Sequence, residues 1–161
     1  MNTQVSTLCY IQHNGKTLML HRIKKDKDIH QGKYNGLGGK LLPGETPEEC
    51  VVREVLEESG LTIRHPRLRG VMTFPEFKPQ EDWLVFLFTA AEFSGTLESC
   101  AEGHLEWIAN EDLTDLPLWE GDKFFLSWLK EERFFSAKFN YKDGRLMNHK
   151  VTFYDGSVPV E

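Results

Sequence analysis

Residues 46–60 constrain the fold more than any other part of this 161-residue sequence, because they carry helix signals at both ends. Thr46 is a favourable N-cap, Pro47 takes the first helical position, and Glu49, three residues after the cap, completes a capping box. Gly60 is a typical helix terminator, since glycine adopts the left-handed conformation at little steric cost. The sequence therefore predicts a helix that begins at Pro47 and ends near Ser59.

This helix has an acidic side and an apolar side. At about 100° per residue, positions i, i+3 and i+4 share a face, and Glu54, Glu57 and Glu58 have this spacing. Three converging carboxylates repel one another unless a cation lies among them, and hard oxygen ligands favour Mg²⁺ or Mn²⁺ over zinc. We therefore expect a metal site for a phosphorylated substrate. The opposite side is apolar and is expected to pack on a sheet through Val51, Val52, Val55 and Leu56.

The charge balance limits the possible partners. The chain has 19 Lys plus Arg against 25 Asp plus Glu, which gives a net charge of −6. Long nucleic acids bind mainly through neutralised phosphates, so an acidic chain without a basic stripe is unsuited to them. The acidic residues within 45–58 have a plain alternative as a solvated helix face, and only their arrangement argues against it.

Length and hydropathy predict a single domain over residues 1–161 with room for a hydrophobic core. No apolar run approaches the roughly 18 residues that a membrane span needs, and residues 1–5 lack signal-peptide features. Cys9, Cys50 and Cys100 are odd in number and far apart, which argues against a disulfide framework or a zinc site. We expect a cytoplasmic protein without a membrane partner or an obligate protein partner.

The remaining pattern predicts strands on both sides of two helices. Asn14-Gly15 is a strong hairpin signal between the apolar runs 6–12 and 17–22. The polar residues 24–33 predict an exposed loop, and aromatic residues at helical spacing predict a second helix over 121–130. Other strands are predicted at 34–39, 67–73, 83–93 and 104–108, with a final hairpin of 134–141 and 150–154. The expected fold class is α/β (α+β), with a mixed β-sheet sandwiched between helices.

The acidic helix and the loop before it resemble a known family signature. Gly39, five residues, Glu45, seven residues and then Arg53-Glu54-Val55-Leu56-Glu57-Glu58-Ser59-Gly60-Leu61 match the Nudix box of the MutT-type hydrolases at every defining position. Many fixed residue types at fixed spacing make this match specific. The resemblance implies the Nudix fold and the hydrolysis, by water and a divalent metal, of a nucleoside diphosphate linked to a further group.

The resemblance also implies roles for residues of the box. The metal, Mg²⁺ or Mn²⁺, would be held by Glu54, Glu57 and Glu58 and by the backbone carbonyl of Gly39. Arg53 would orient these carboxylates, and Glu45 would support them.

One further carboxylate of the site often comes from outside the box. Glu102 is the first choice, Glu106 is its rival, and a solvated loop acid is the structural alternative for Glu102. A free carboxylate, Glu54, Glu58 or Glu102, would take the proton of the attacking water. The sequence does not choose among these three.

A second resemblance concerns the substrate. Tyr34-Asn35-Gly36-Leu37-Gly38-Gly39-Lys40 and Leu118-Trp119-Glu120-Gly121-Asp122 look like elements of the oxidised-purine nucleoside triphosphatases, of the 8-oxo-dGTP diphosphatase type. This resemblance implies a role in clearing oxidised nucleotides, and so in DNA repair. It places Asn35 and Asp122 at the base edge and Trp119 on the base ring, with Thr7 and Ile29 lining the same pocket. Gly121 and Glu120 depart from the family's Asp and Pro, which puts a two-carboxyl grip on the base in doubt.

Each base-pocket residue has a structural alternative, and the activity has rivals too. Trp119 serves equally well as a core anchor, Asn35 as a turn residue and Asp122 as a helix cap.

The substrate alternatives are an ordinary nucleoside triphosphate, a nucleotide sugar or a dinucleoside polyphosphate. A non-catalytic nucleotide sensor of the same fold would not need the full set of charged box residues. An isopentenyl-diphosphate isomerase would need a catalytic cysteine, and neither Cys9 nor Cys50 is an obvious match.

Overall fold

The computed structural model describes residues 2–23, 32–98, 101–155 and 158–160. Its strands are β1 (Asn2–His13), β2 (Lys16–His21), β3 (Tyr34–Asn35), β4 (Leu61–Arg64), β5 (Arg67–Lys78), β6 (Glu81–Ala90), β7 (Glu92–Gly95), β8 (His104–Ala109), β9 (Phe134–Lys142), β10 (Arg145–Asp155) and β11 (Val158–Val160). Its helices are α1 (Pro47–Ser59), the 3-10 helix η1 (Asn110–Asp115) and α2 (Glu120–Trp128). No helix in the described ranges is long and apolar enough to cross a membrane.

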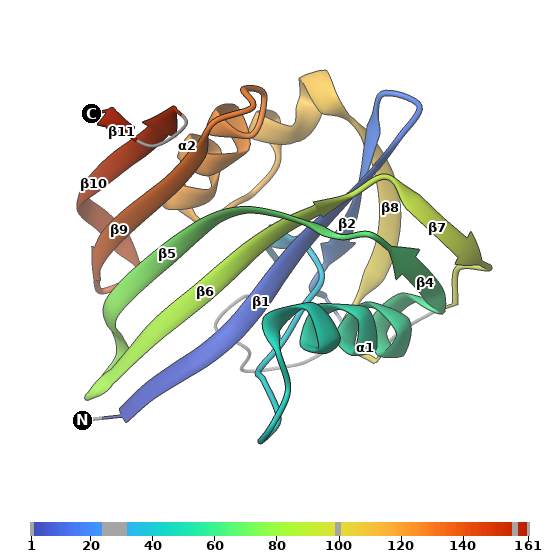
Figure 1. Cartoon of the computed structure of the whole chain (residues 1–161), viewed down its shortest axis with the longest axis horizontal. Coiled ribbons are helices and arrows are strands. Elements are labelled where there is room, and N and C mark those ends of the chain that lie inside the picture. The colour runs from blue at the N-terminus through green and yellow to red at the C-terminus, as the bar shows by residue number, and fades with distance from the viewer. Residues whose placement is uncertain (1, 24–31, 99–100, 156–157, 161) are drawn as a thin grey trace.

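The large sheet is mixed, as predicted. Over the described residues its strand order is β11-β10-β9-β5-β6-β1-β2-β3, with β8 paired to β2. The β1–β6 and β5–β9 pairs are parallel and the other pairs antiparallel. The long strands β1, β6 and β5 run side by side through the middle of the molecule (Figure 1).

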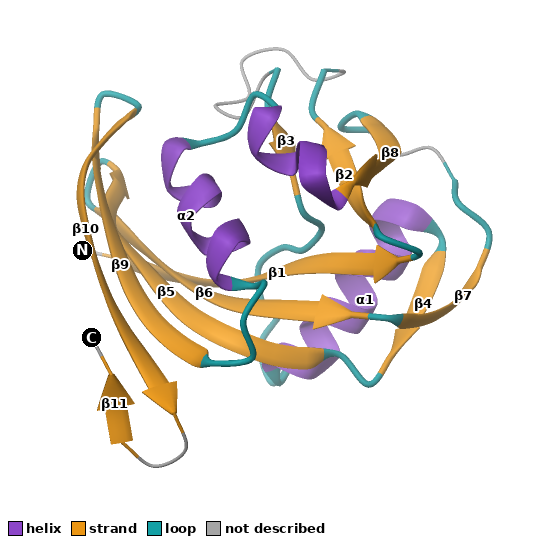
Figure 2. Cartoon of the chain, turned by 90° about the horizontal axis from the view of Figure 1, so that it is seen from above, coloured by secondary structure: helices purple, strands orange, loops and turns teal. Residues whose placement is uncertain are grey.

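The two helices lie on opposite faces of this sheet (Figure 2). Successive side chains of a strand point to opposite faces of the sheet, so one strand contributes residues to both hydrophobic cores. On β6, Leu87 packs with Phe125 of α2, whereas the next residue, Phe88, packs in the cluster that contains Val51 and Val55 of α1. The predicted sandwich of a mixed sheet between helices is confirmed.

Helix α1 begins and ends as its sequence predicts. The Thr46 hydroxyl accepts a hydrogen bond from Glu49 N–H, and the Glu49 carboxylate accepts one from Thr46 N–H, which makes the capping box. Gly60 ends the helix at φ 79°. One expectation is wrong: Leu56 is 48% exposed, while Val51 and Val55 are fully buried. Leu56 lies about 100° around the helix from Val55 and therefore leaves the buried stripe.

The strand expected over 83–93 is in fact two strands. β6 ends at Ala90, and β7 leaves the large sheet to pair with β4 in a separate two-stranded sheet. No glycine or proline interrupts 83–93, so the local sequence carries no sign of this break. The Asn14-Gly15 hairpin is confirmed, with both residues at positive φ, but its strands pair over only two registered positions before β1 turns to β6.

Candidate active site

The carboxylate helix is tied to the sheet through the glycines that precede it. Gly39 O accepts hydrogen bonds from Thr7 N–H at 2.9 Å and from the Thr7 hydroxyl at 3.3 Å, and the Cys50 thiol lies 3.4 Å from it. A Cβ on Gly39 would lie 2.5 Å from Cδ of Glu54. Glycine at this position therefore leaves the space that the Glu54 carboxylate occupies.

The Gly39 carbonyl is the predicted backbone ligand of the metal. Two donors of Thr7 engage Gly39 O, which is therefore directed at β1. Metal binding through this oxygen stays a prediction, and the carboxylates of α1 are the stronger candidates for the ligands.

Arg53 is the centre of a hydrogen-bond network among the carboxylates. Its Nε and Nη2 donate to the two Glu45 oxygens at 2.7 and 3.0 Å, a two-pronged contact. Its Nη1 donates to Glu54 at 3.0 Å and to Glu57 at 3.3 Å, and Nη2 reaches Lys40 O at 3.2 Å. The Arg53 hydrogen bond lowers the pKa of Glu45, which stays ionised. Arg53 therefore joins Glu45 to Glu54 and Glu57, and its orienting role and the supporting role of Glu45 stay predictions.

Glu58 is held by a backbone N–H group and not by Arg53, and its carboxylate lies in a more buried position. It accepts a hydrogen bond from Gly38 N–H at 2.8 Å. Burial raises its pKa to about 8, and the charges of Glu102 and Glu54 add to this rise. The pKa of Glu54 is likewise raised, first by burial and also by the charge of Glu102. Glu102 therefore lies within electrostatic reach of both carboxylates.

The structure separates the two candidates for the extra carboxylate. Glu106 lies exposed on β8 and accepts a hydrogen bond from the Tyr34 hydroxyl at 3.4 Å. Glu102, half-buried just before β8, interacts with the charges of Glu54 and Glu58 on α1. The position after Glu102 is Gly103, where a Cβ would overlap the carbonyl oxygen of His21. The turn that presents Glu102 thus packs closely on β2, and Glu102 is the better choice.

The residues present fit a hard divalent cation. Within the described ranges, no three His, Cys, Asp or Glu side chains form a ready-made metal cluster, and Arg53 and Gly38 N–H hold three of the four carboxylates. The donor set is entirely carboxylate oxygen, which suits Mg²⁺ or Mn²⁺. Burial and mutual repulsion disfavour the anionic forms of Glu54 and Glu58, and a cation among them would offset both effects.

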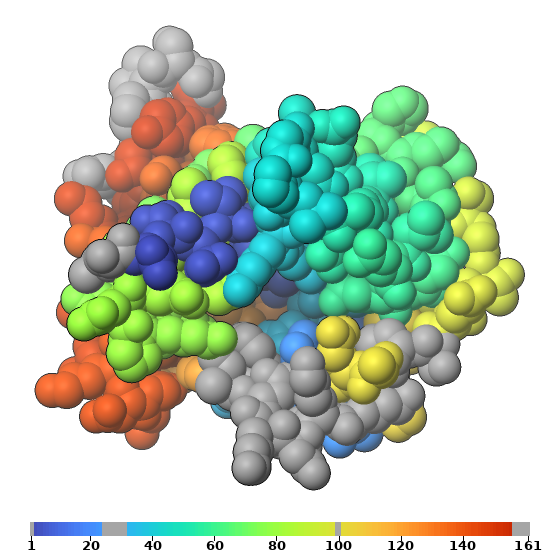
Figure 3. Space-filling model, turned by 90° about the horizontal axis from the view of Figure 1, so that it is seen from below, coloured from blue at the N-terminus to red at the C-terminus, as the bar shows by residue number. Residues whose placement is uncertain are grey.

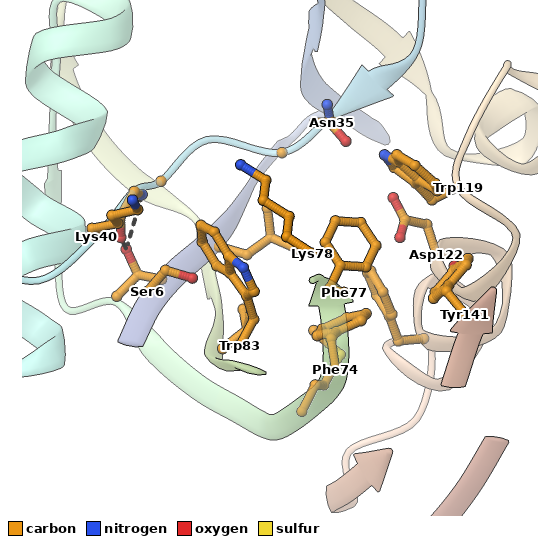
Figure 4. A pocket seen from close by; sticks show the side chains of 18 of the residues that line it. Ser6, Asn35, Lys40, Phe74, Phe77, Lys78, Trp83, Trp119, Asp122 and Tyr141 are labelled. Carbon is orange, nitrogen blue, oxygen red and sulfur yellow. Dashed lines mark hydrogen bonds between the residues drawn. The ribbon is translucent and has the colours of Figure 1, made fainter. Parts of the chain in front are cut away.

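A cavity of about 330 Å³ opens beside this helix. On the face seen in Figure 3, the start of β1, the β5–β6 turn and the segment that leads into α1 lie beside one another around a hollow in the surface. Lys40 and Ser6 lie at the end near α1, and Trp83 and Lys78 follow (Figure 4). Asn35, Trp119, Asp122 and Tyr141 lie together at the other end (Figure 4). The cavity therefore joins an aromatic and polar end to the glycines beside the carboxylate helix.

The structure brings together most of the predicted base-pocket residues. Asn35, Trp119, Asp122 and Thr7 all line the cavity, although they come from segments far apart in the sequence. Ile29, the fifth predicted residue, falls outside the described residues.

The structure contradicts the helix-cap alternative for Asp122 and places Trp119 at the cavity. Asp122 does not cap α2, because the N-cap residue is Trp119 and no side chain makes the cap hydrogen bond. Leu118 is the buried neighbour that packs into the core, whereas Trp119 is half-buried at the cavity. The Trp119 ring contacts Phe77 and Tyr141 edge to face, at centroid distances of 5.1 and 5.5 Å. These contacts leave it among the aromatic walls of the cavity.

Several residues that line the cavity were not predicted from the sequence. The Nζ atoms of Lys40 and Lys78 lie 5.3 and 5.6 Å from the centroid of the Trp83 ring. The Trp83 indole N–H donates a hydrogen bond to the Glu81 carboxylate at 2.9 Å. Tyr141 reaches the cavity from β9. Period-2 alternation places Trp83 on the same face as Val85 and Leu87, but only the strand pairing shows that this face borders the cavity.

The raised pKa of Asp122 predicts how the free energy of unfolding depends on pH. Burial raises its pKa from 3.8 to about 8, against a smaller opposing effect of Lys33. Between these values the folded protein keeps a proton that the unfolded chain releases, so the free energy of unfolding should fall as pH rises from about 5 to about 8. Urea denaturation at several pH values, with a chelator present, measures this slope.

The matched variant is Asp122→Asn, which keeps the shape and removes the titration. Glu58 titrates in the same direction, so the test is the wild-type stability minus that of the variant. This difference should decrease steadily over the same pH range. Parallel curves for the two proteins would contradict the assignment to Asp122.

Comparison with known proteins agrees with this geometry. The NUDIX domain family matches residues 2–129. The chain is a Nudix hydrolase. It is 32% identical over 127 residues to the uncharacterized Nudix hydrolase YvcI of Bacillus subtilis, covering 76% of this chain and 77% of that protein. It is 30% identical over 119 residues to the oxidized purine nucleoside triphosphate hydrolase of Mus musculus, covering 74% and 76%.

A solved structure confirms the architecture of this Nudix hydrolase. The crystal structure of a MutT protein from Bacillus halodurans superimposes with a TM-score of 0.82 at 30% identity, over 92% of this chain and 97% of that one. The family resemblance expected from residues 39–61 is therefore confirmed, and so is the class of enzyme. Enzymes of this family act on small nucleotide substrates and generally depend on a divalent metal.

Proposed function

We propose that this Nudix hydrolase cleaves a nucleoside triphosphate to a nucleoside monophosphate and pyrophosphate, with Mg²⁺ as its metal and Mn²⁺ as a substitute. We further propose that the preferred base is an oxidised purine, as in 8-oxo-dGTP, so that the enzyme clears damaged nucleotides before DNA synthesis. The observation that carries the proposal is the continuous cavity that links Asn35, Trp119 and Asp122 to the glycines beside the carboxylate helix.

The far end of the cavity suits a purine. Trp119 offers an aromatic face to a planar ring, and Phe77 and Tyr141 enclose it edge to face. Asn35 provides both a donor and acceptors, and Asp122 provides a carboxyl group, so the base edge meets groups able to discriminate it.

The near end suits a chain of phosphates. Lys40, Lys78 and Arg22 line the cavity, although the protein as a whole is acidic. The Trp83 ring lies close to both lysine ammonium groups, and its N–H bond to Glu81 fixes the ring in turn. These cations would attract the phosphates toward α1.

The chemistry would proceed on the carboxylate helix. Glu54, Glu57 and Glu58 would hold the metal, which when bound neutralises phosphate charge and lowers the pKa of a water molecule. Arg53 would keep Glu54 and Glu57 in place through its hydrogen bonds. Glu54, Glu58 and Glu102 remain the three choices for the base that accepts the water proton.

The identity of the base is the part of the proposal with most rivals. The mouse relative is named for oxidised purine nucleoside triphosphates, which supports this choice. A further relative, an NAD-capped RNA hydrolase NudC from Chromobacterium violaceum, is 34% identical over 107 residues, or 65% of this chain and 37% of that one. Residues 121–122 carry only one carboxyl group, that of Asp122, whereas the oxidised-purine nucleoside triphosphatases have two at these positions. A nucleotide panel should therefore include ordinary triphosphates, 8-oxo-dGTP, a nucleotide sugar and dinucleotides.

The bond that breaks is tested by hydrolysis in oxygen-labelled water. With 8-oxo-dGTP and Mg²⁺, we expect nucleoside monophosphate plus pyrophosphate, with one labelled oxygen in one of these two products by mass spectrometry. Release of labelled orthophosphate with nucleoside diphosphate would contradict the proposed cleavage. Equal kcat/KM for 8-oxo-dGTP and dGTP would remove the oxidised-base assignment and leave the hydrolase assignment in place.

A further inference from the structure

The turn between β5 and β6 contains a β-bulge that changes which side chains reach the cavity. Residues 75–77 of β5 lie opposite a single residue of β6, Asp82. The Glu76 N–H donates a hydrogen bond to the Asp82 carboxylate at 2.8 Å, which holds the bulge in place. Consecutive side chains of a regular strand point to opposite faces of the sheet, yet Phe77 and Lys78 both line the cavity. The bulge therefore directs Lys78 into the cavity wall.

Contacts with β1 fix the position of this turn and of the Trp83 ring. The Asn2 N–H donates to the Gln80 carbonyl oxygen at 3.1 Å. The Gln4 side-chain amide donates to one Glu81 oxygen at 3.4 Å, and the other Glu81 oxygen accepts the Trp83 indole N–H at 2.9 Å. Because the indole N–H is bonded to Glu81, the Trp83 ring is held as part of the cavity wall (Figure 4).

Two ammonium groups lie near this one aromatic ring. The Nζ atoms of Lys40 and Lys78 are 5.3 and 5.6 Å from the Trp83 centroid, within the range of a cation–π interaction. Like charges brought together repel each other unless an anion lies close to both. Among the described residues, neither lysine forms a salt bridge with a carboxylate. The pair therefore carries positive charge that a bound anion would neutralise.

The two lysines lie on the part of the cavity wall that adjoins the carboxylate helix. Lys40 follows Gly39, and a Cβ on Gly39 would lie 2.5 Å from Cδ of Glu54. Trp119 lies at the other end of the cavity (Figure 4). A nucleotide whose base stacks on Trp119, and whose attacked phosphorus lies beside α1, would extend its remaining phosphates to within reach of these lysines.

We propose that Lys78 is a substrate-binding residue, which together with Lys40 binds the pyrophosphate part of the substrate. In this anion subsite, Trp83 and Glu81 are positioning residues. The Trp83 ring holds two flexible lysine side chains near one point, so less conformational entropy is lost when phosphate binds, and Glu81 holds the ring. This inference rests on the proposed function, because that function makes pyrophosphate the leaving group.

The test measures the binding of inorganic pyrophosphate with Mg²⁺ by isothermal titration calorimetry, beside the binding of 8-oxo-dGMP. Lys78→Gln keeps most of the side chain and removes its charge, so the affinity for pyrophosphate should fall about ten-fold. The affinity for 8-oxo-dGMP should stay within about two-fold, because its single phosphate is not part of the pyrophosphate. Lys78→Arg keeps the charge and should bind pyrophosphate within about three-fold of the wild type. Lys150→Gln is the matched control, because Lys150 is exposed on β10 and does not line the cavity.

Substitutions of Trp83 test its positioning role, with thermal melts to show that each variant is folded. Trp83→Leu removes the aromatic face and should weaken pyrophosphate binding about five-fold, whereas Trp83→Phe keeps an aromatic face and should weaken it less. Because Trp83 acts through the lysines, Trp83→Leu should have a smaller effect in the Lys78→Gln background than in the wild type. Equal effects in the two backgrounds would contradict the positioning role.

Unchanged pyrophosphate affinity in Lys78→Gln would overturn the inference. So would an equal loss of affinity for pyrophosphate and 8-oxo-dGMP, which is what a purely structural role of Lys78 predicts. The proposed function fails by a different result: release of orthophosphate in labelled water, together with a pyrophosphate affinity that depends on Lys78, would contradict the proposed cleavage and support the anion subsite. Release of pyrophosphate, together with a pyrophosphate affinity that does not depend on Lys78, would leave the cleavage in place and overturn this inference.

Discussion

Replacing Glu58 by glutamine is expected to lower kcat by at least about 100-fold while the protein remains folded. Glutamine keeps an oxygen that can accept the Gly38 N–H hydrogen bond, which is 2.8 Å long in the structure. The change removes only the negative charge that a metal ion needs. Because burial opposes the ionised form of Glu58, the metal-free variant should unfold at the same temperature as the wild type or higher. Steady-state kinetics with Mg²⁺ and thermal melts in a chelator measure the two effects.

Glu48→Gln is the control for charge on the same helix. Glu48 is exposed in the first turn of α1 and outside the carboxylate network of Arg53. We expect its kcat to stay within about two-fold of the wild-type value. Near-normal turnover of Glu58→Gln would show that Glu58 does not bind the metal. A large loss in both variants would point to a general effect of charge on α1.

Replacing Gly38 by alanine should reduce both stability and activity. Gly38 has φ 152°, and a Cβ there would overlap the carbonyl oxygen of Thr7 and lie 3.1 Å from Cα of Leu8. These neighbours are backbone atoms of β1, which do not rotate away as a side chain does. Backbone strain and overpacking together are expected to cost about 3 kcal/mol, or a drop in Tm of roughly 6–12 °C for a protein of this size. The Gly38 N–H bond to Glu58 would be displaced as well, so kcat should fall.

Gly15→Ala is the control that introduces backbone strain at positive φ without a steric clash of the added Cβ atom. Gly15 also has positive φ, at 74°, but nothing lies within 4 Å of a Cβ built there. We expect a loss of only about 1 kcal/mol and unchanged kcat. Differential scanning calorimetry and kinetics on both variants make the comparison. Similar Tm values for the two variants would mean that β1 yields to the added methyl group, contrary to the expected collision.

Local signals in the sequence were sufficient to predict the carboxylate helix. Thr46, Glu49 and Gly60 mark its ends through interactions that span only a few residues, and the structure reproduces each one. The i, i+3, i+4 spacing also places the carboxylates on one side without reference to the rest of the chain. The same spacing brings Arg53 to Glu57, four residues later, and its long side chain also reaches the adjacent Glu54.

The mixed sheet between helices was predictable from the alternation of strand and helix patterns, but its boundaries were not. Strand β6 ends at Ala90 because β7 pairs with β4. This outcome depends on which strands meet in the folded chain. The local sequence does not contain that information.

The helix and its carboxylates follow from the amino-acid sequence alone, because capping and helical spacing act over a few residues, and the family signature is contained in residues 39–61. Folding of the whole chain placed Glu102, and not Glu106, within electrostatic reach of Glu58, directed Gly39 O toward Thr7 and brought Tyr141 to the N-terminus of α2. These outcomes depend on strand register and burial, which join residues distant in the sequence. The pKa of Asp122 shows the difference most directly: its identity is written in the chain, but its proton is held because folding removes the carboxyl group from water.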